Sequence, residues 1–157
     1  FDIHPYFVKA FKKRWYVVAY SPGTHDIRCY ALDRMENVII SDKVFKMPKD
    51  LEPAEYFKDC FGIINNKDSE TQKVVLKVDA FQSNYIRNLP LHDSQKETER
   101  TEEYSIFEYH LKPEFDLEQE IFSNMDTMEV LEPQWLRDEI AERLRKLAKK
   151  YKLDLPE

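Results

Sequence analysis

Short runs of strand-forming side chains dominate the first third of the chain. Residues 15–20 have the sequence Trp-Tyr-Val-Val-Ala-Tyr, which consists almost entirely of strand formers, and Ser21-Pro22-Gly23 after them is typical of a turn. Residues 1–11 alternate well enough to predict another strand. Residues 27–40 predict a third strand region, which we expect to be interrupted near Glu36-Asn37.

Consecutive short strands joined by tight turns predict a small, curled SH3-like β-barrel over residues 1–47. Such barrels usually have about five strands, so we expect this one to be incomplete. Trp15, Val17 and Ala19 lie at alternate positions of one predicted strand. They therefore share a face, and we expect that face to be in the core.

A helical connector is predicted at residues 48–69. Pro48 and Pro53 interrupt the strand pattern, and residues 54–61 then form a short apolar-periodic stretch that Gly62 can end. We expect this connector to join two subdomains.

Residues 70–157 show strand-like and helix-like segments in alternation. The predicted elements are a strand at 73–78, a helix at 81–89, strands at 95–98 and 104–111, a helix at 117–125, a strand at 128–131 and a last helix after Pro133. This βαββαβα order is that of a ferredoxin-like domain with an additional terminal helix. The predicted fold class of the whole chain is therefore α+β.

The last predicted helix has a continuous apolar face. Its members recur at spacings of four, four, three and four residues, and they are Leu136, Ile140, Leu144, Leu147 and Tyr151. Glu139 with Arg143 and Glu142 with Lys146 add favourable pairs one turn apart.

Composition excludes several classes of protein. Hydrophobic residues make up 42% of the 157 residues, which is enough for a packed core, whereas the 2 glycines leave almost no room for a Gly-rich phosphate loop. No apolar run approaches the length of a membrane span and no signal peptide opens the chain, so we expect a cytoplasmic protein with no membrane partner. The chain begins with Phe1 instead of Met, which indicates a fragment.

Charge is distributed unevenly, although the net charge is −6. Residues 1–50 carry nine Lys and Arg against six Asp and Glu, and the remaining residues carry 15 against 24. We therefore expect an anionic partner to meet the first third of the chain.

The residue types that catalysis or metal binding requires are poorly placed. The four histidines and two cysteines have no metal-ligand spacing, and no serine lies in a nucleophile elbow. We predict no catalytic residues, no metal and no cofactor, and we interpret the chain as a non-enzymatic module.

Three blocks of sequence resemble a known family. They are His4-Pro5-Tyr6, the strand from Arg14 to Tyr20 with Trp15-Tyr16 in it, and Ile27 to Met35 with Arg28, Tyr30 and Leu32-Asp33-Arg34. In this order they resemble the WYL domain, which is named for a Trp-Tyr-Leu triplet. Val17 departs from the triplet but keeps its strand character. The region from about residue 70 is similar, in element order alone, to the C-terminal extension that often follows this domain.

The resemblance implies a fold and a role. WYL domains are Sm-like or SH3-like barrels that usually follow a winged helix-turn-helix in bacterial transcriptional regulators and sense anionic ligands, either nucleotides or short single-stranded nucleic acid. The first barrel strand and the helix-turn-helix, which would contact duplex DNA, are then expected upstream of Phe1. We also expect a homodimer.

Arg28 and Arg34 are the principal candidates for holding the ligand. On one extended strand, Arg28, Tyr30, Leu32 and Arg34 share parity, so the two arginines would reach the same side about 20 Å apart. A guanidinium donates two parallel hydrogen bonds to a phosphate. Tyr6, Tyr16 and Arg14 are weaker candidates, because aromatic faces among cations form a platform for single-stranded nucleic acid.

Three interpretations stay open. The first is an effector sensor that controls a DNA-binding domain. The second is a structural dimerisation module without a ligand, with a vestigial barrel pocket. Separately, Asp33-Arg34 can be interpreted as only a structural ion pair. The third and most remote is a phosphoesterase.

Overall fold

The computed structural model describes residues 1–153, which divide into two compact units of α+β structure. Unit 1 comprises Phe1–Lys58 and Gly62–Ile64, and unit 2 comprises Asp59–Phe61 together with the chain from Asn65 onward. None of the helices within 1–153 is both long enough and apolar enough to cross a membrane.

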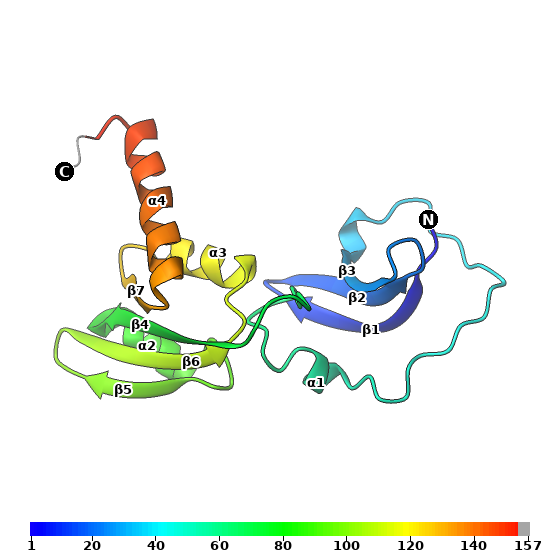
Figure 1. The fold of residues 1–157 in the computed structure, drawn as a ribbon, viewed down its shortest axis with the longest axis horizontal. Helices are drawn as coiled ribbons and strands as arrows, with labels where there is room; N and C mark the ends of the chain where they lie inside the picture. The colour runs from blue at the N-terminus through cyan, green and yellow to red at the C-terminus, as the bar shows by residue number, and fades with distance from the viewer. Residues whose placement is uncertain (154–157) are drawn as a thin grey trace. The chain divides into compact units, whose positions relative to one another are not determined.

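Unit 1 is built on a three-stranded antiparallel sheet (Figure 1). Its elements are β1 (His4–Phe11), β2 (Arg14–Ser21), β3 (Asp26–Ala31), the 3₁₀ helix η1 (Leu32–Arg34) and the short helix α1 (Pro53–Tyr56). The strands lie in the order β1-β2-β3, so β2 is central and β1 and β3 are edges. Val18 and Ala19 in the middle of β2 are fully buried.

Aromatic side chains from α1 and its end cover one face of this sheet. Phe7 of β1 makes edge-on contacts with the rings of Tyr56 and Phe57, with centroids 6.4 and 6.2 Å apart. Lys9, two residues further along β1, places its ammonium 4.2 Å from the centre of the Phe57 ring. The connector thus supplies part of the core that three strands alone cannot enclose.

Three expectations for this unit are wrong. The strand predicted at 27–40 ends at Ala31, because η1 follows and Asn37 takes a left-handed backbone with φ 51°. The strand-forming side chains of residues 38–40 have no neighbouring strand and are exposed, since β-propensity acts only where a ladder is available. The helix predicted at 54–61 spans only Pro53–Tyr56. Trp15, expected in the core, is 57% exposed.

Unit 2 has the βαββαβα element order that the sequence predicts (Figure 1). Its elements are β4 (Gln72–Asp79), α2 (Ala80–Asn88), β5 (Lys96–Arg100), β6 (Tyr104–Leu111), α3 (Phe115–Ser123), β7 (Met128–Glu132) and α4 (Gln134–Lys150). The four strands form one antiparallel sheet in the order β5-β6-β4-β7.

The core of unit 2 lies on one face of this sheet. Alternate residues of β4 and β6 are fully buried, and helices α2, α3 and α4 add one apolar face each. The buried members include Val74, Leu76, Val78, Phe107, Tyr109, Leu111, Ile86, Leu117 and Leu136. Burial of its ring raises the pKa of Tyr109, whose hydroxyl donates to Gln95 Oε1 at 3.0 Å.

The chain joins the two units through an interleaved stretch. Cys60 forms an isolated parallel bridge with Lys112 and belongs to unit 2, whereas Ile63 accepts a hydrogen bond from the Cys29 thiol at 3.2 Å and belongs to unit 1.

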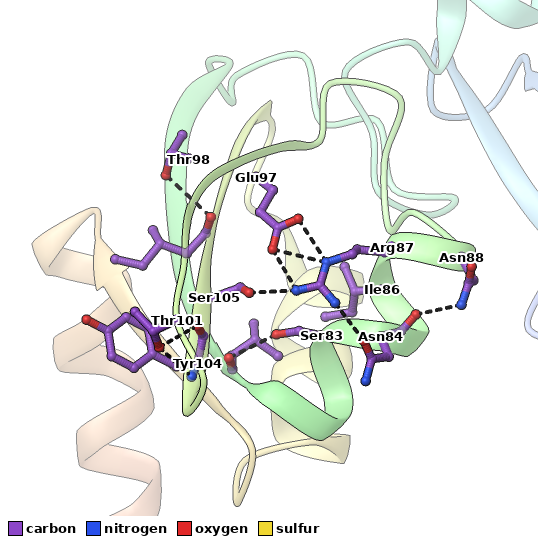
Figure 2. Close-up of polar contacts among 12 residues, drawn as sticks. Ser83, Asn84, Ile86, Arg87, Asn88, Glu97, Thr98, Thr101, Tyr104 and Ser105 are labelled. Atoms are coloured by element: carbon purple, nitrogen blue, oxygen red, sulfur yellow. Dashed lines mark hydrogen bonds and ion pairs between the residues drawn. The ribbon is translucent and has the colours of Figure 1, made fainter.

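Arg87 of α2 links its helix to the sheet (Figure 2). Its guanidinium donates to both carboxylate oxygens of Glu97 on β5, at 2.7 and 2.9 Å, and to the hydroxyl of the buried Ser105 on β6, at 2.8 Å. It also donates to Asn84 at 2.7 Å. The hydrogen bonds from Arg87 lower the pKa of Glu97 to about 2.

We expect this contact to make the stability of unit 2 depend on pH. The pKa of Glu97 is lower in the folded protein than in the unfolded chain, where it is near 4.5. The ionised carboxylate therefore contributes its full stabilisation of the fold above pH 4.5, and this stabilisation is lost as the pH falls toward 2. The free energy of unfolding of the wild type should therefore fall by about 2 kcal/mol more than that of Glu97→Gln between pH 5 and pH 2. Urea titrations of both proteins measure this difference, and parallel curves would contradict it.

Candidate ligand-binding site

Arg28 lies on the edge strand β3, directly opposite Ala19 of β2. Its side chain is exposed, and within residues 1–153 no carboxylate pairs with it. Tyr30, two residues along and therefore on the same face, packs against Phe1 with ring centroids 5.6 Å apart. Arg28 is thus a free cation beside an aromatic pair.

Arg14 and Arg34 lie at the other end of the sheet. Arg14 begins β2, and its Nε is 3.1 Å from Asp33 Oδ2 in η1. Arg34 follows Asp33, is exposed, and has no carboxylate partner in the part of the chain that the structure describes. The interpretation of Asp33-Arg34 as an ion pair is therefore wrong, because Asp33 pairs with Arg14 instead.

The expectation that Arg28 and Arg34 share a strand face is also wrong, because β3 ends at Ala31 and Arg34 belongs to η1. Tyr16 pairs with Ala31, whereas Arg28 pairs with Ala19. Tyr16 and Ala19 are three positions apart on β2, so Tyr16 and Arg28 lie on opposite faces of the sheet. Arg14, Tyr16 and Arg34 therefore lie toward one end of the sheet, and Arg28 lies further along β3, on the face opposite Tyr16.

Tyr6 belongs to an aromatic cluster at the end of the sheet that is far from Arg14 and Arg34. His4 stacks on Phe45, with ring centroids 4.8 Å apart, and lies 5.6 Å from the ring of Tyr20. Tyr6 approaches the same Phe45 at 6.2 Å. Burial raises the pKa of Tyr6, and the nearby Tyr20 phenol adds to this effect.

Phe45 is the member of this cluster that the sequence did not indicate. It lies in residues 35–47, where the chain has no regular secondary structure and hence no periodicity that would single out one aromatic residue. The structure alone shows that Phe45 packs between His4 and Tyr6.

No group of three or more His, Cys, Asp or Glu side chains within residues 1–153 is arranged to hold a metal ion.

The sequence of this chain matches the models of two protein families. A WYL-domain model matches residues 1–40, and a WCX-domain model matches residues 70–148, which is half of the chain. The chain belongs to the WCX-domain family, and its first 40 residues match the WYL domain. Arg14, Arg28 and Arg34 all lie within the WYL match.

Among solved structures, the proteasome accessory factor B/C (PafBC) of Arthrobacter aurescens is similar to this WYL- and WCX-domain chain, with 18% sequence identity and a TM-score of 0.43. The similarity covers 99% of this chain and 23% of that chain, so this chain spans about a quarter of its length. No curated protein was found to match.

We expect the Arg14–Asp33 contact of the WYL domain to contribute little to stability. Both side chains are more than one third exposed, and exposed ion pairs contribute less than about 1 kcal/mol. Asp33→Asn should therefore change the free energy of unfolding by less than that amount, as measured by urea titration. A loss above about 2 kcal/mol would show that η1 depends on this contact for its formation.

Proposed function

We propose that this chain is the effector-sensing module of a bacterial transcriptional regulator and binds an anionic ligand, either a nucleotide or a short single-stranded nucleic acid. Its parts are a WYL-type SH3-like barrel at residues 1–47, a connector at 48–69 and a ferredoxin-like WCX domain at 70–157. The β5-β6-β4-β7 strand order supports the last of these assignments.

One observation carries this proposal. Arg28 and Arg34 lie inside the stretch that matches the WYL model, and both are exposed cations without a carboxylate partner among residues 1–153. A guanidinium keeps its charge and suits phosphate oxygens, so two unneutralised arginines, one on β3 and one in η1 after it, favour a phosphorylated ligand.

The placement of the arginines favours an extended ligand over a compact one. Arg28 lies on the edge strand β3, and Arg34 lies in η1, which directly follows that strand. A single-stranded nucleic acid can follow that edge and bring successive phosphates to each guanidinium. Tyr16 and, more distantly, Tyr6 are then available for base stacking, whereas Arg14, whose charge Asp33 balances, is a weaker candidate contact.

Ligand binding would regulate by shifting populations. The module would favour one arrangement of DNA-binding domains carried elsewhere in the cytoplasmic protein, which would act as a homodimer on duplex DNA. The proposed role is binding and not catalysis.

The test is fluorescence anisotropy of the chain with a short labelled single-stranded DNA at several salt concentrations. We expect salt-sensitive binding that the Arg28→Ala/Arg34→Ala variant loses. Each lost phosphate contact should lower the slope of log affinity against log salt by about 0.7. Arg100→Ala in unit 2 is the matched control, because it removes an exposed arginine from outside the WYL domain and should leave binding unchanged.

Competition with mononucleotides identifies the ligand class. Displacement of the labelled DNA by a mononucleotide at similar concentration would indicate a small nucleotide effector. Equal binding by the wild type and by the Arg28→Ala/Arg34→Ala variant would reject the site.

A further inference from the structure

Residues 36–47, which we call the strap, are attached to the rest of unit 1 mainly through one aromatic ring. The strap contains no helix or strand, and Phe45 is its only side chain that is not exposed. In Figure 1 it runs as a long cyan loop away from the three-stranded sheet. Its apolar side chains from Val38 to Ile40 are 73% to 95% exposed. A segment with so few buried contacts opens at little cost.

The ring of Phe45 lies in the aromatic cluster in the way that a stacked base would. It is nearly parallel to the imidazole of His4, with an interplanar angle of 4° and a centroid distance of 4.8 Å. Tyr6 approaches Phe45 at 6.2 Å, and Tyr20 flanks His4 at 5.6 Å. Proteins hold the bases of single-stranded nucleic acid by the same kind of stacking, which tolerates any base because every base has a π face.

The second contact of the strap with unit 1 is weak. Lys43 pairs with Asp2, which precedes β1, and the two side chains are 72% and 53% exposed. Exposed ion pairs contribute little to stability. The stack on His4 is therefore the main anchor of the strap, and a ligand that competes for His4 would release it.

The aromatic cluster lies at the same end of the sheet as Arg28. His4 pairs with Tyr20 in the central strand β2. Ala19, the residue before Tyr20, pairs with Arg28 on β3. The backbones of β1 and β3 are two strand spacings apart, about 10 Å, and successive residues of β2 point to opposite faces. A single strand of nucleic acid that stacks a base on His4 can thus pass round this end of the sheet and bring a phosphate to Arg28.

We propose that His4, flanked by Tyr6 and Tyr20, is a base-stacking site for single-stranded nucleic acid, and that Phe45 of the strap closes this site when no ligand is bound. The inference rests on the nucleic-acid ligand of the proposed function and adds to it a site and its regulation. Entry of a base displaces the Phe45 ring and releases the strap. Because the strap continues into the connector, its release changes the start of the segment that joins the two units.

Fluorescence anisotropy of the full chain with a short labelled single-stranded DNA tests the closed site. Phe45→Ala removes the competing ring, so the affinity should rise about three- to tenfold, which is the advantage that one aromatic pair gives the closed state. The gain involves no phosphate, so the slope of log affinity against log salt should stay that of the wild type. Phe45→Trp keeps a stacking ring and should bind no more tightly than the wild type.

Two further measurements show whether the gain comes from stacking on His4. The double variant His4→Ala/Phe45→Ala should bind like His4→Ala alone, because Phe45 then has no ring to compete for. DNA of the same length with abasic linkers in place of its nucleosides keeps the phosphates and lacks the bases. On this probe Phe45→Ala should show no gain over the wild type.

Val44→Ala is the matched control in the strap. Val44 is the neighbour of Phe45 and is 95% exposed, so this variant should bind like the wild type. Phe45→Leu protects the test against unfolding, since leucine keeps an apolar side chain at this position but cannot stack. It should show most of the gain of Phe45→Ala, and urea titration checks that it remains folded.

An unchanged or lower affinity in both Phe45→Ala and Phe45→Leu would overturn the closed site. A gain that persists on abasic DNA or in the His4→Ala background would overturn it as well. In either case, binding that still requires Arg28 and Arg34 would leave the sensing role intact. Absence of DNA binding by the wild type and by every variant would overturn both the base-stacking site and the nucleic-acid ligand.

Discussion

The register of β4 is the constraint on which unit 2 depends. This strand pairs with β6 on one side and β7 on the other, and its alternate side chains Val74, Leu76 and Val78 are fully buried. A shift by one residue would place Lys73 and Lys77 in the core, so the register is strongly determined. The cleft that Asp68, Glu70 and Trp135 help to line depends on this register as well, because Gln72 at the start of β4 also lines the cleft and accepts a hydrogen bond from the Trp135 indole at 2.9 Å.

Unit 1 has a smaller sheet than unit 2, and this difference explains why its unpaired arginines are exposed. Its sheet has only three strands, so few of its side chains are buried, most of them in β2, and polar side chains remain accessible along both edges. The unpaired arginines occur at the β3 edge and in the η1 turn that follows it. An edge strand leaves both its faces and its backbone accessible to an extended partner.

The elements of the fold could be predicted where the apolar residues of a segment recur with one clear spacing. The strands at 15–20, 73–78 and 104–111 were predicted within two residues, because each has a buried face or a dense run of strand formers. The strand predicted at 27–40 failed because local propensity does not reveal whether a neighbouring strand exists. The prediction that Trp15 lies in the core was wrong for a related reason, since the elements that cover a sheet face are remote in sequence.

The candidate site could be predicted less completely than the fold. The WYL resemblance identified the residues, and the comparison confirms the family. Their arrangement depends on the end of β3 at Ala31 and on the pairing of Asp33 with Arg14, and both are tertiary outcomes. The approach of Phe45 to His4 and Tyr6 depends likewise on a loop without regular structure.

The order of chain segments at the boundary has a consequence for dissection of the molecule. Residues 59–61 belong to unit 2, and residues 62–64, which follow them, belong to unit 1. A cut before residue 59 removes from unit 1 the Ile63 carbonyl that the Cys29 thiol contacts, and a cut after residue 64 removes from unit 2 the bridge between Cys60 and Lys112. No single break in the backbone therefore leaves both units with all of their own contacts. The two units have separate cores, but neither can be produced alone by one truncation without a loss to itself or to the other.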